Sequence, residues 1–459
     1  MGLGTPCQCE GRGSRIHQGA KDQVNVFERV RALDEKYHFI NTFADDLESE
    51  HEGRLTGYAV SVKDNICVKG MQSTAGSRIL EGYIPPYDAT VIAKCRAEGA
   101  SILGKTTQDE FGFGTFNVNT PYQKPLNPHD PERSTGGSSG GAACITAVAD
   151  FPHLALSEST GGSISCPASW CGVVGLTPTY GRVSRWGLID YANSLDKIGV
   201  MAKTVEEAAL LLEVISGPDK YDSTVLNEAV PSFTELDSID GLKMGVPKEY
   251  FGEGVDPRVE EIVWSSIKKL ESSGATVSEM SLLHTKYSLS SYYIIAMAEA
   301  STNLAKFSGL RYGLQKPIAG DFNQYFSKVR TEGLGDEAKR RVMLGTFTRM
   351  AGYRDAYYLK ALKVRTKVIE DFKKALKSVD ILAAPTMPVV APRFDEIEQL
   401  EPIQHYMMDI LTVAPNLAGI PMVSVPCGEA HGMPVGLHLM AGHLEEHKLL
   451  KAAWMVEQL

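Results

Sequence analysis

Two glycine- and serine-rich stretches are central to this sequence: "STGGSSGG" at 134–141 and "STGGSISCPAS" at 159–169. Glycine readily adopts backbone conformations that other residues avoid, so both stretches are expected to form turns, not regular elements. The first stretch continues as "AACITAVA" at 142–149, which has the composition of a buried helix. Each turn carries serines. The two turns are therefore either ordinary connections between elements or loops that both contribute to one active site.

The composition of the chain limits the functions to consider. It has 459 residues and 43% hydrophobic content, as globular proteins do, and its formal net charge of -10 argues against direct binding of phosphate backbones. Eight scattered cysteines without a paired CxxC pattern favour reduced thiols in a cytoplasmic protein, and the N-terminus resembles a mitochondrial transit peptide only weakly, so a mitochondrial location is the lesser alternative. No run of eighteen apolar residues exists that could span a membrane. Residues 1–22 lack the apolar core of a secretory signal and are predicted to be a disordered tail.

Strand-like and helix-like segments alternate along both ends of the chain. Residues 55–68 and 242–250 resemble strands, and residues 88–99 and 257–274 resemble helices. Three more apolar segments, at 379–392, 419–428 and 432–442, look like core strands. This alternation predicts an α/β fold. We expect a single domain over residues 23–459, with a mainly helical segment at about 285–375.

Three short motif matches are rejected because their context is wrong. "GASILGKT" at 99–106 fits the phosphate-loop pattern, but a helix precedes it and no apolar helix follows. "GGSSG" at 136–140 fits the nucleophile elbow of serine hydrolases, but the preceding residues are polar and contain proline. "HLEEH" at 443–447 has a zinc-binding spacing on one predicted helix face, but no third ligand is suggested. We therefore expect no metal site in this chain.

Lys63, Ser138 and Ser163 together form a plausible catalytic group. A serine hydroxyl needs a base before it can attack a carbonyl, and a buried neutral lysine can act as that base. A second hydroxyl between the two can carry the proton across. The flanking glycines leave backbone N–H groups free to point at one developing oxyanion.

These stretches resemble the amidase signature family. The likeness rests on "GGSSGGAA" and "STGGSISCPASWCGVVGLTPTYGRVSRWGL" and extends over roughly residues 55–455. It implies an α/β/α fold with a large mixed central β-sheet covered by helices, and a Ser–cis-Ser–Lys triad. Ser163 would be the nucleophile, Ser138 the bridging serine after a cis peptide bond, and Lys63 the base. Thr160, Gly161 and Gly162 would form the oxyanion hole.

Further segments are similar to one branch of that family, the A subunits of glutamine-dependent aspartyl/glutamyl-tRNA amidotransferases. They are "EASTNLAKFSGLRYG", "KRRVMLGTFTRMAGYRDAYYLKALKVR" and "DILTVAPNLAGIPMVSVPCG". The resemblance implies that Tyr293, Arg341 and Asp409 hold free glutamine, with Tyr292 and Arg340 as the neighbouring alternatives. Arginine would pair with the α-carboxylate and aspartate with the α-ammonium.

The resemblance also implies the partners. The chain would hydrolyse glutamine and supply ammonia for amidation of Glu-tRNA(Gln) or Asp-tRNA(Asn), in a complex with a B subunit plus a small C-type subunit. ATP and Mg²⁺ would act on another subunit, and this chain would need no cofactor. The alternative is a stand-alone amidase for another small or fatty amide. Two positions depart from the family pattern: Ser165 stands in place of an arginine, and Ala142 in place of Ser or Glu.

Overall fold

The computed structural model describes residues 20–459. Helix α1 (Ala20–Tyr37) includes the last three residues of the predicted N-terminal tail. The tail prediction was therefore wrong for residues 20–22, and its remaining part lies outside the described residues, as do Cys7 and Cys9.

Within residues 20–459, eleven strands form one mixed sheet, in the order β1-β3-β2-β4-β6-β5-β10-β11-β9-β7-β8. Strand β2 is parallel to both β3 and β4, whereas β4 is antiparallel to β6. This sheet confirms the predicted α/β class. The strands are β1 (Ile40–Phe43), β2 (Ala59–Lys63), β3 (Ser101–Thr106), β4 (His153–Ser159), β5 (Val174–Thr177), β6 (Lys197–Ala202), β7 (Lys243–Pro247), β8 (Thr276–Met280), β9 (Ile381–Pro385), β10 (Met422–Ala430) and β11 (Met433–Ala441).

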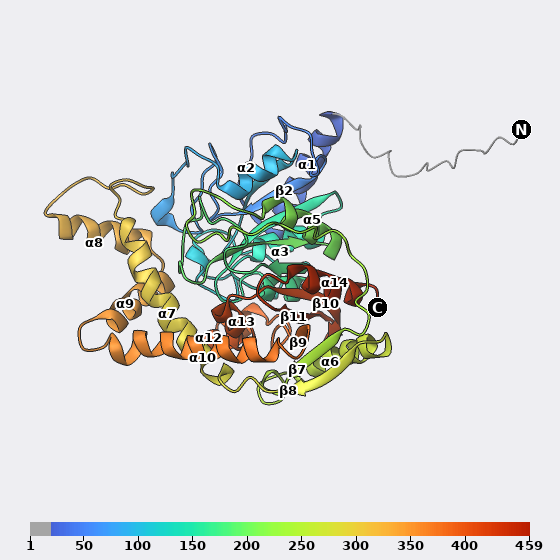
Figure 1. Ribbon diagram of the computed structural model, residues 1–459. Coiled ribbons are helices and arrows are strands. Elements are labelled where there is room, and N and C mark those ends of the chain that lie inside the picture. Colours follow the sequence, from blue (N-terminus) through green and yellow to red (C-terminus); the bar gives the residue numbers. More distant parts are fainter. Residues whose placement is uncertain (1–19) are drawn as a thin grey trace, which may run out of the picture.

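Helices cover both faces of the sheet (Figure 1). The helices after α1 are α2 (Thr90–Ala97), α3 (Gly140–Val148), α4 (Ser165–Cys171), α5 (Val205–Ile215), α6 (Pro257–Ser272), α7 (Ser288–Asn303), α8 (Phe322–Gly333), α9 (Asp336–Arg349), α10 (Lys360–Ala375), α11 (Phe394–Ile397), α12 (Pro402–Met407), α13 (Val413–Ala418) and α14 (Glu446–Glu457). No helix among these combines the length and the apolar character needed to cross a bilayer.

The two faces follow from the alternation of side chains along each strand. In β9, Ile381 and Ala383 belong to a core shared with α2, α5, α6 and α14. Leu382 and Ala384 of the same strand belong to a second core, shared with α7, α10 and α13. Because β9 is buried on both sides, its sequence is continuously apolar.

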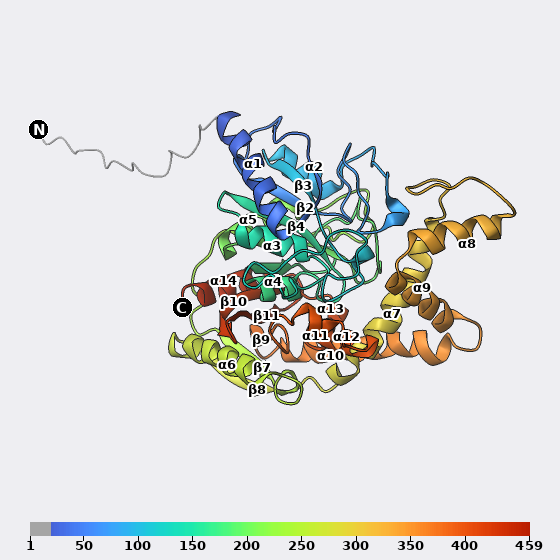
Figure 2. The ribbon, with the colours of Figure 1, turned by 180° about the vertical axis from the view of Figure 1, so that it is seen from behind.

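The predicted helical segment is present as α7 to α10, which form a lobe at one side of the sheet (Figures 1 and 2). Helices α7 and α9 pack against each other, and α7 also packs against α10 and α13. The lobe is thus joined to the sheet through α13, directly before β10.

The structure places two of the rejected motifs in surroundings that do not suit the functions of those motifs. It also corrects the predicted start of one helix. Residues 101–106 of the phosphate-loop match form β3, and Lys105 is buried beside Asp64. Helix α14 begins only at Glu446, so His443 precedes it and does not share a helix face with His447 as predicted. Within the described residues, no group of three metal-ligating side chains is present.

Candidate active site

Lys63 is the last residue of β2, a strand buried along its whole length. Its Nζ lies 2.8 Å from Ser138 Oγ, 2.9 Å from the Glu158 carbonyl oxygen and 3.0 Å from Glu158 Oε2. Burial lowers the pKa of Lys63 below its ordinary value, and the charge of Glu158 partly opposes this shift. The structure therefore places the predicted base in contact with the predicted bridging serine.

Ser138 lies in the first glycine turn, and its peptide bond with Gly137 is cis. The turn is held on both sides of this bond. Gly137 N–H donates to the Thr115 carbonyl over 2.7 Å, and the Ser138 carbonyl accepts from Asp109 N–H over 3.2 Å. These contacts fix the Ser138 hydroxyl in the interior, at the end of β2.

Ser163 lies in the second glycine turn, between β4 and α4. It is 8% exposed, whereas Lys63 and Ser138 are fully buried, so Ser163 is the member of the group nearest to solvent. The two turns pack closely. A Cβ added at Gly136 would lie 2.8 Å from Cα of Pro167 in α4. Because β2 and β4 are parallel neighbours, Lys63 and the Ser163 turn emerge at the same edge of the sheet.

Thr160, Gly161 and Gly162, the predicted oxyanion-hole residues, form the backbone directly before Ser163. A Cβ at Gly161 would lie 2.3 Å from Cζ of Tyr292, and one at Gly162 would lie 2.3 Å from Oγ1 of Thr412. Glycine at these two positions therefore allows the loop to lie directly against Tyr292 and Thr412. Gly162 N–H donates to Ser159 Oγ over 3.2 Å, so this amide already has a partner within the loop.

Glu158 and Asp196 belong to the site but were missed from the sequence. Both are buried, and Thr160 Oγ1 lies 2.8 Å from Glu158 Oε1 and 2.8 Å from Asp196 Oδ1. Burial, together with the charge of Glu158, raises the pKa of Asp196 well above its ordinary value. The sequence around Glu158, "LALSES", changes from apolar to polar residues toward its end and gives no signal for a buried carboxylate.

Tyr293 and Asp409, two of the predicted glutamine-binding residues, are in direct contact. Tyr293 Oη donates to Asp409 Oδ2 over 2.5 Å, and Thr115 Oγ1 donates to Asp409 Oδ1 over 2.9 Å. Burial raises the pKa of Asp409 to about 6, although both hydroxyls favour its ionised form. The neighbouring alternative, Tyr292, packs against Gly161 instead.

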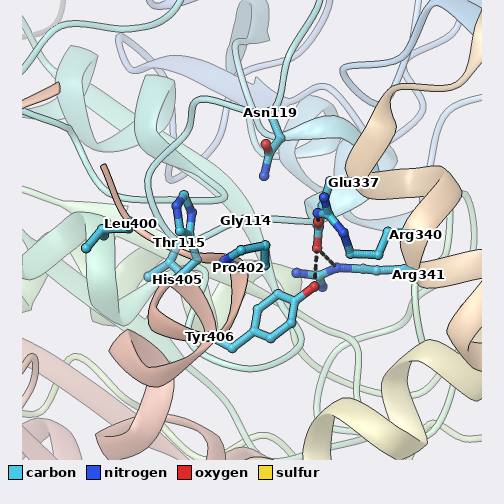
Figure 3. A pocket seen from close by; sticks show the side chains of 10 residues that line it. All are labelled: Gly114, Thr115, Asn119, Glu337, Arg340, Arg341, Leu400, Pro402, His405 and Tyr406. Carbon is cyan, nitrogen blue, oxygen red and sulfur yellow. Dashed lines mark hydrogen bonds and ion pairs between the residues drawn. The ribbon is translucent and has the colours of Figure 1, made fainter. Parts of the chain in front are cut away.

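Arg341 is buried beside the same tyrosine. Its guanidinium carbon lies 5.4 Å from the Tyr293 ring centre and 5.5 Å from that of Tyr406. Nε donates to Glu337 Oε1 over 2.7 Å, and Nη1 donates to Tyr191 Oη over 2.7 Å. In Figure 3, Arg341, Glu337 and Tyr406 point toward one another. Glu337 and Tyr406 were not predicted from the sequence.

A cavity of about 180 Å³ lies beside Arg341. Its lining includes Thr115, whose hydroxyl binds Asp409 and whose carbonyl binds the Ser138 turn. One loop therefore connects the cavity with the serine group. Figure 3 shows the lining residues: Gly114, Thr115, Asn119, Glu337, Arg340, Arg341, Leu400, Pro402, His405 and Tyr406.

The two departures from the family pattern are both buried. Ser165 begins α4, and its hydroxyl has no hydrogen-bond partner within residues 20–459. Ala142 lies in α3 and packs in a small apolar core with Ala168 and Met201. Neither contacts Lys63 through a hydrogen bond among the described residues.

The chain belongs to the amidase family, whose family model matches residues 26–450. This range contains every candidate site residue named above. Individual relatives narrow the family further. The chain is 52% identical over 412 residues to the A subunit of the glutamyl-tRNA(Gln) amidotransferase of Methanosarcina mazei, covering 89% of this chain and 85% of the relative. It is 47% identical over 448 residues to the protein of that name from Carboxydothermus hydrogenoformans, covering 94% and 92%.

Solved structures agree with this assignment. The A subunit of the glutamyl-tRNA(Gln) amidotransferase of Thermotoga maritima superposes with a TM-score of 0.82 at 36% identity, covering 96% of this chain and 92% of the other. A 6-aminohexanoate cyclic dimer hydrolase also superposes, with a TM-score of 0.82 at 22% identity, covering 95% and 93%. The second likeness shows only that the two proteins share a fold.

Proposed function

We propose that this chain is the glutaminase subunit of a tRNA-dependent amidotransferase. One observation carries the proposal: the buried Arg341 lines a small cavity together with Thr115, whose hydroxyl donates to Asp409 and whose carbonyl accepts from the turn that holds Ser138. Free glutamine has an α-carboxylate for the arginine and an α-ammonium for the aspartate. The relatives from Methanosarcina mazei and Thermotoga maritima are named for glutamyl-tRNA(Gln) amidation, which supports the same function.

The reaction would proceed through an acyl-enzyme. Lys63 takes a proton from Ser138, Ser138 takes one from Ser163, and Ser163 Oγ attacks the side-chain amide carbon of glutamine. The oxyanion forms against backbone amides of the Thr160–Gly162 loop. The proton then returns through Ser138 to the leaving nitrogen, and ammonia departs. Water releases glutamate from Ser163 by the same route.

The size of the cavity favours glutamine over the alternative substrates. About 180 Å³ lies below the range of roughly 300–1,000 Å³ that drug-sized ligands occupy, so the end of the substrate that binds beside Arg341 must be small. A small amino acid amide is compatible with it. This argument counts against a stand-alone amidase for fatty substrates.

The ammonia would be used elsewhere in the complex. We infer that a B subunit together with a small C-type subunit completes the enzyme, that ATP and Mg²⁺ act on another subunit, and that the aminoacylated tRNA is Glu-tRNA(Gln) or Asp-tRNA(Asn). This chain itself would need no cofactor. We also infer a cytoplasmic location, because the six cysteines among the described residues are free thiols.

The test uses the chain co-expressed with its partner subunits. Glutamate release from glutamine and amidation of both aminoacyl-tRNAs are measured, with Ser163→Ala as the matched variant. Loss of the nucleophile should lower turnover by at least about a thousandfold and abolish the glutamyl-enzyme seen by mass spectrometry. Retention of activity within about tenfold of the unmodified chain would contradict Ser163 as the nucleophile. Full activity toward simple amides without partners would favour the stand-alone amidase.

A further inference from the structure

Two oxygens of Glu158 lie within hydrogen-bond distance of Lys63 and have no role in the mechanism proposed above. Nζ has three partners at hydrogen-bond distance, and two of them are oxygens of Glu158, the carbonyl and Oε2. A neutral amine has two N–H bonds and one lone pair. Because a carbonyl and a carboxylate oxygen only accept, they occupy both N–H bonds. The lone pair is left facing the third partner, the Ser138 hydroxyl.

Glu158 is itself held in one orientation. Asn65 Nδ2 donates to Oε2 over 3.1 Å, and Thr160 Oγ1 lies 2.8 Å from Oε1. All of these groups are buried. The carboxylate therefore has a donor on each oxygen in addition to Lys63, as a buried ionised carboxylate requires.

Proton counting identifies which carboxyl group is ionised. The Thr160 hydroxyl touches both Glu158 and Asp196 but has only one proton to donate. One of the two carboxyl groups must therefore donate to Thr160. Asp196 Oδ2 accepts from the amides of Tyr191 and Ala192, and the Ala192 amide also lies 3.0 Å from Oδ1, so Oδ1 has the fewer donors and is the oxygen that can carry a proton toward Thr160. Burial raises the pKa of Asp196 well above its ordinary value, in agreement with this arrangement.

We propose that Glu158 is a positioning residue that aims the Lys63 amine at Ser138 and stabilises the ammonium that Lys63 becomes during the reaction. The inference rests on the proposed proton route from Ser163 to Lys63. In that step the Ser163 O–H bond breaks, its proton moves to Ser138, and the Ser138 proton forms the third N–H bond of Lys63. Glu158 thus serves Lys63 as the buried aspartate serves the histidine in a Ser-His-Asp triad.

Other titratable groups face this pair and must be considered in any pH profile. Asp109, on the loop after β3, has a pKa raised to about 6 by burial. Lys197, at the start of β6, has a pKa lowered to about 7, by burial first and then by the charge of Arg365. Both remain in a Glu158 variant. A difference between the variant and the unmodified chain therefore reports on Glu158 itself.

The experiment follows two rates against pH in the assembled complex, with Glu158→Gln as the variant. The first is kcat/KM for glutamine. The second is covalent labelling of Ser163 by a fluorophosphonate, which needs the proton route but not the glutamine pocket. An opposite charge within about 4–6 Å typically shifts a pKa by about 1–3 units, so the acid limb of the labelling profile should move down by about that amount, whereas the kcat/KM profile also contains the protonation of Asp409. The plateau should fall by at least about tenfold because the ammonium loses its counter-charge.

Two controls separate this role from a structural one. Glu446→Gln removes another buried carboxylate, paired with Arg182 and outside the site, and should leave both profiles unchanged. Asp196→Asn should also leave the acid limb in place, because an amide can donate to Thr160 as the protonated carboxyl does. If Asp196→Asn moves the limb and Glu158→Gln does not, the inference is overturned.

The remaining outcomes are also decisive. If glutamine is not hydrolysed but Ser163 is labelled with the expected shift, the proposed function fails while the inference about Glu158 stands. An acid limb unchanged by Glu158→Gln in both assays would refute the inference alone. Should Glu158→Gln not fold, Glu158→Asp keeps the charge and shortens its reach. It should lower the plateau while moving the limb by less than about one unit, and a larger downward shift would contradict the inference.

Discussion

Replacing Arg341 by lysine tests how the cavity distinguishes glutamine from other amides. A guanidinium has five N–H bonds, and Arg341 uses one for Glu337 and one for Tyr191. Three remain, enough for a two-pronged pairing with an α-carboxylate. The three N–H bonds of a lysine cannot maintain both internal contacts and also pair with the carboxylate at two points.

The size of the effect follows from this count. A hydrogen bond to a charged group contributes about 1.5–3 kcal/mol, so losing one arm of the fork should cost about 2 kcal/mol. Since about 1.4 kcal/mol corresponds to a factor of ten, kcat/KM for glutamine should fall about thirtyfold. The matched control is Arg340→Lys. Arg340 is half-exposed and pairs with Glu337 at the surface, where such pairs contribute less than about 1 kcal/mol.

The assay compares glutamine with 4-aminobutanamide, which is glutamine without its α-carboxylate. Hydrolysis of both is measured for the unmodified chain, Arg341→Lys and Arg340→Lys. Arg341→Lys should lose activity only toward glutamine, because the second substrate has no carboxylate to pair. Equal losses toward both substrates would mean that Arg341 maintains the fold of the site and does not recognise the carboxylate. A larger loss from Arg340→Lys would assign the contact to the neighbouring arginine.

Three further predictions follow from individual contacts. Gly161→Ala would place a Cβ 2.3 Å from the Tyr292 ring, and the displaced loop should lower kcat/KM for glutamine by about a hundredfold. A loss below about tenfold would mean that the Tyr292 ring moves aside and the loop stays in place. Burial raises the pKa of Asp409 to about 6, so kcat/KM for glutamine should fall as the pH drops through about 6 and the carboxylate is protonated. If the Asp409→Asn variant shows the same fall, another group causes it. Arg182→Met leaves Glu446 buried without its partner, so the free energy of unfolding from denaturant titration should fall by about 3–5 kcal/mol near neutral pH. An unchanged denaturation midpoint would contradict a buried charge at this position.

The glycine turns could be found from the sequence because they break the periodicity of the elements around them. Ser138 and Ser163 stand out there, and Lys63 stands out because a cation ends an apolar strand. Glu158 does not stand out in this way. It occupies a strand position where an outward-facing carboxylate would look the same in sequence, and only the pairing of β2 with β4 turns it toward Lys63.

The residues that contact Arg341 could not be predicted from the sequence for a related reason. Glu337 lies one helical turn before Arg341, so this contact follows from helix geometry once α9 is recognised. Tyr191 and Tyr406 come from segments far apart in the chain, and their rings meet the guanidinium only after the lobe packs against the sheet. The sequence predicted that the lobe is helical, but it had no signal for where α9 would lie.

The loop at residues 109–119 connects substrate selection with the proton route. Asp109 N–H donates to the Ser138 carbonyl, and its carboxylate accepts from the amides of Asn117 and Asn119 over 3.0 Å and 2.8 Å. Thr115, within the same loop, donates to Asp409. The contacts that would hold the α-ammonium and the bridging serine therefore belong to one hydrogen-bonded unit. Arg341 reaches the cavity from α9, in the helical lobe. A displacement of the lobe would therefore weaken recognition of the α-carboxylate while Lys63 and Ser138 stay in contact. Changes in α9 should for this reason raise KM for glutamine more than they lower the rate of the chemical step.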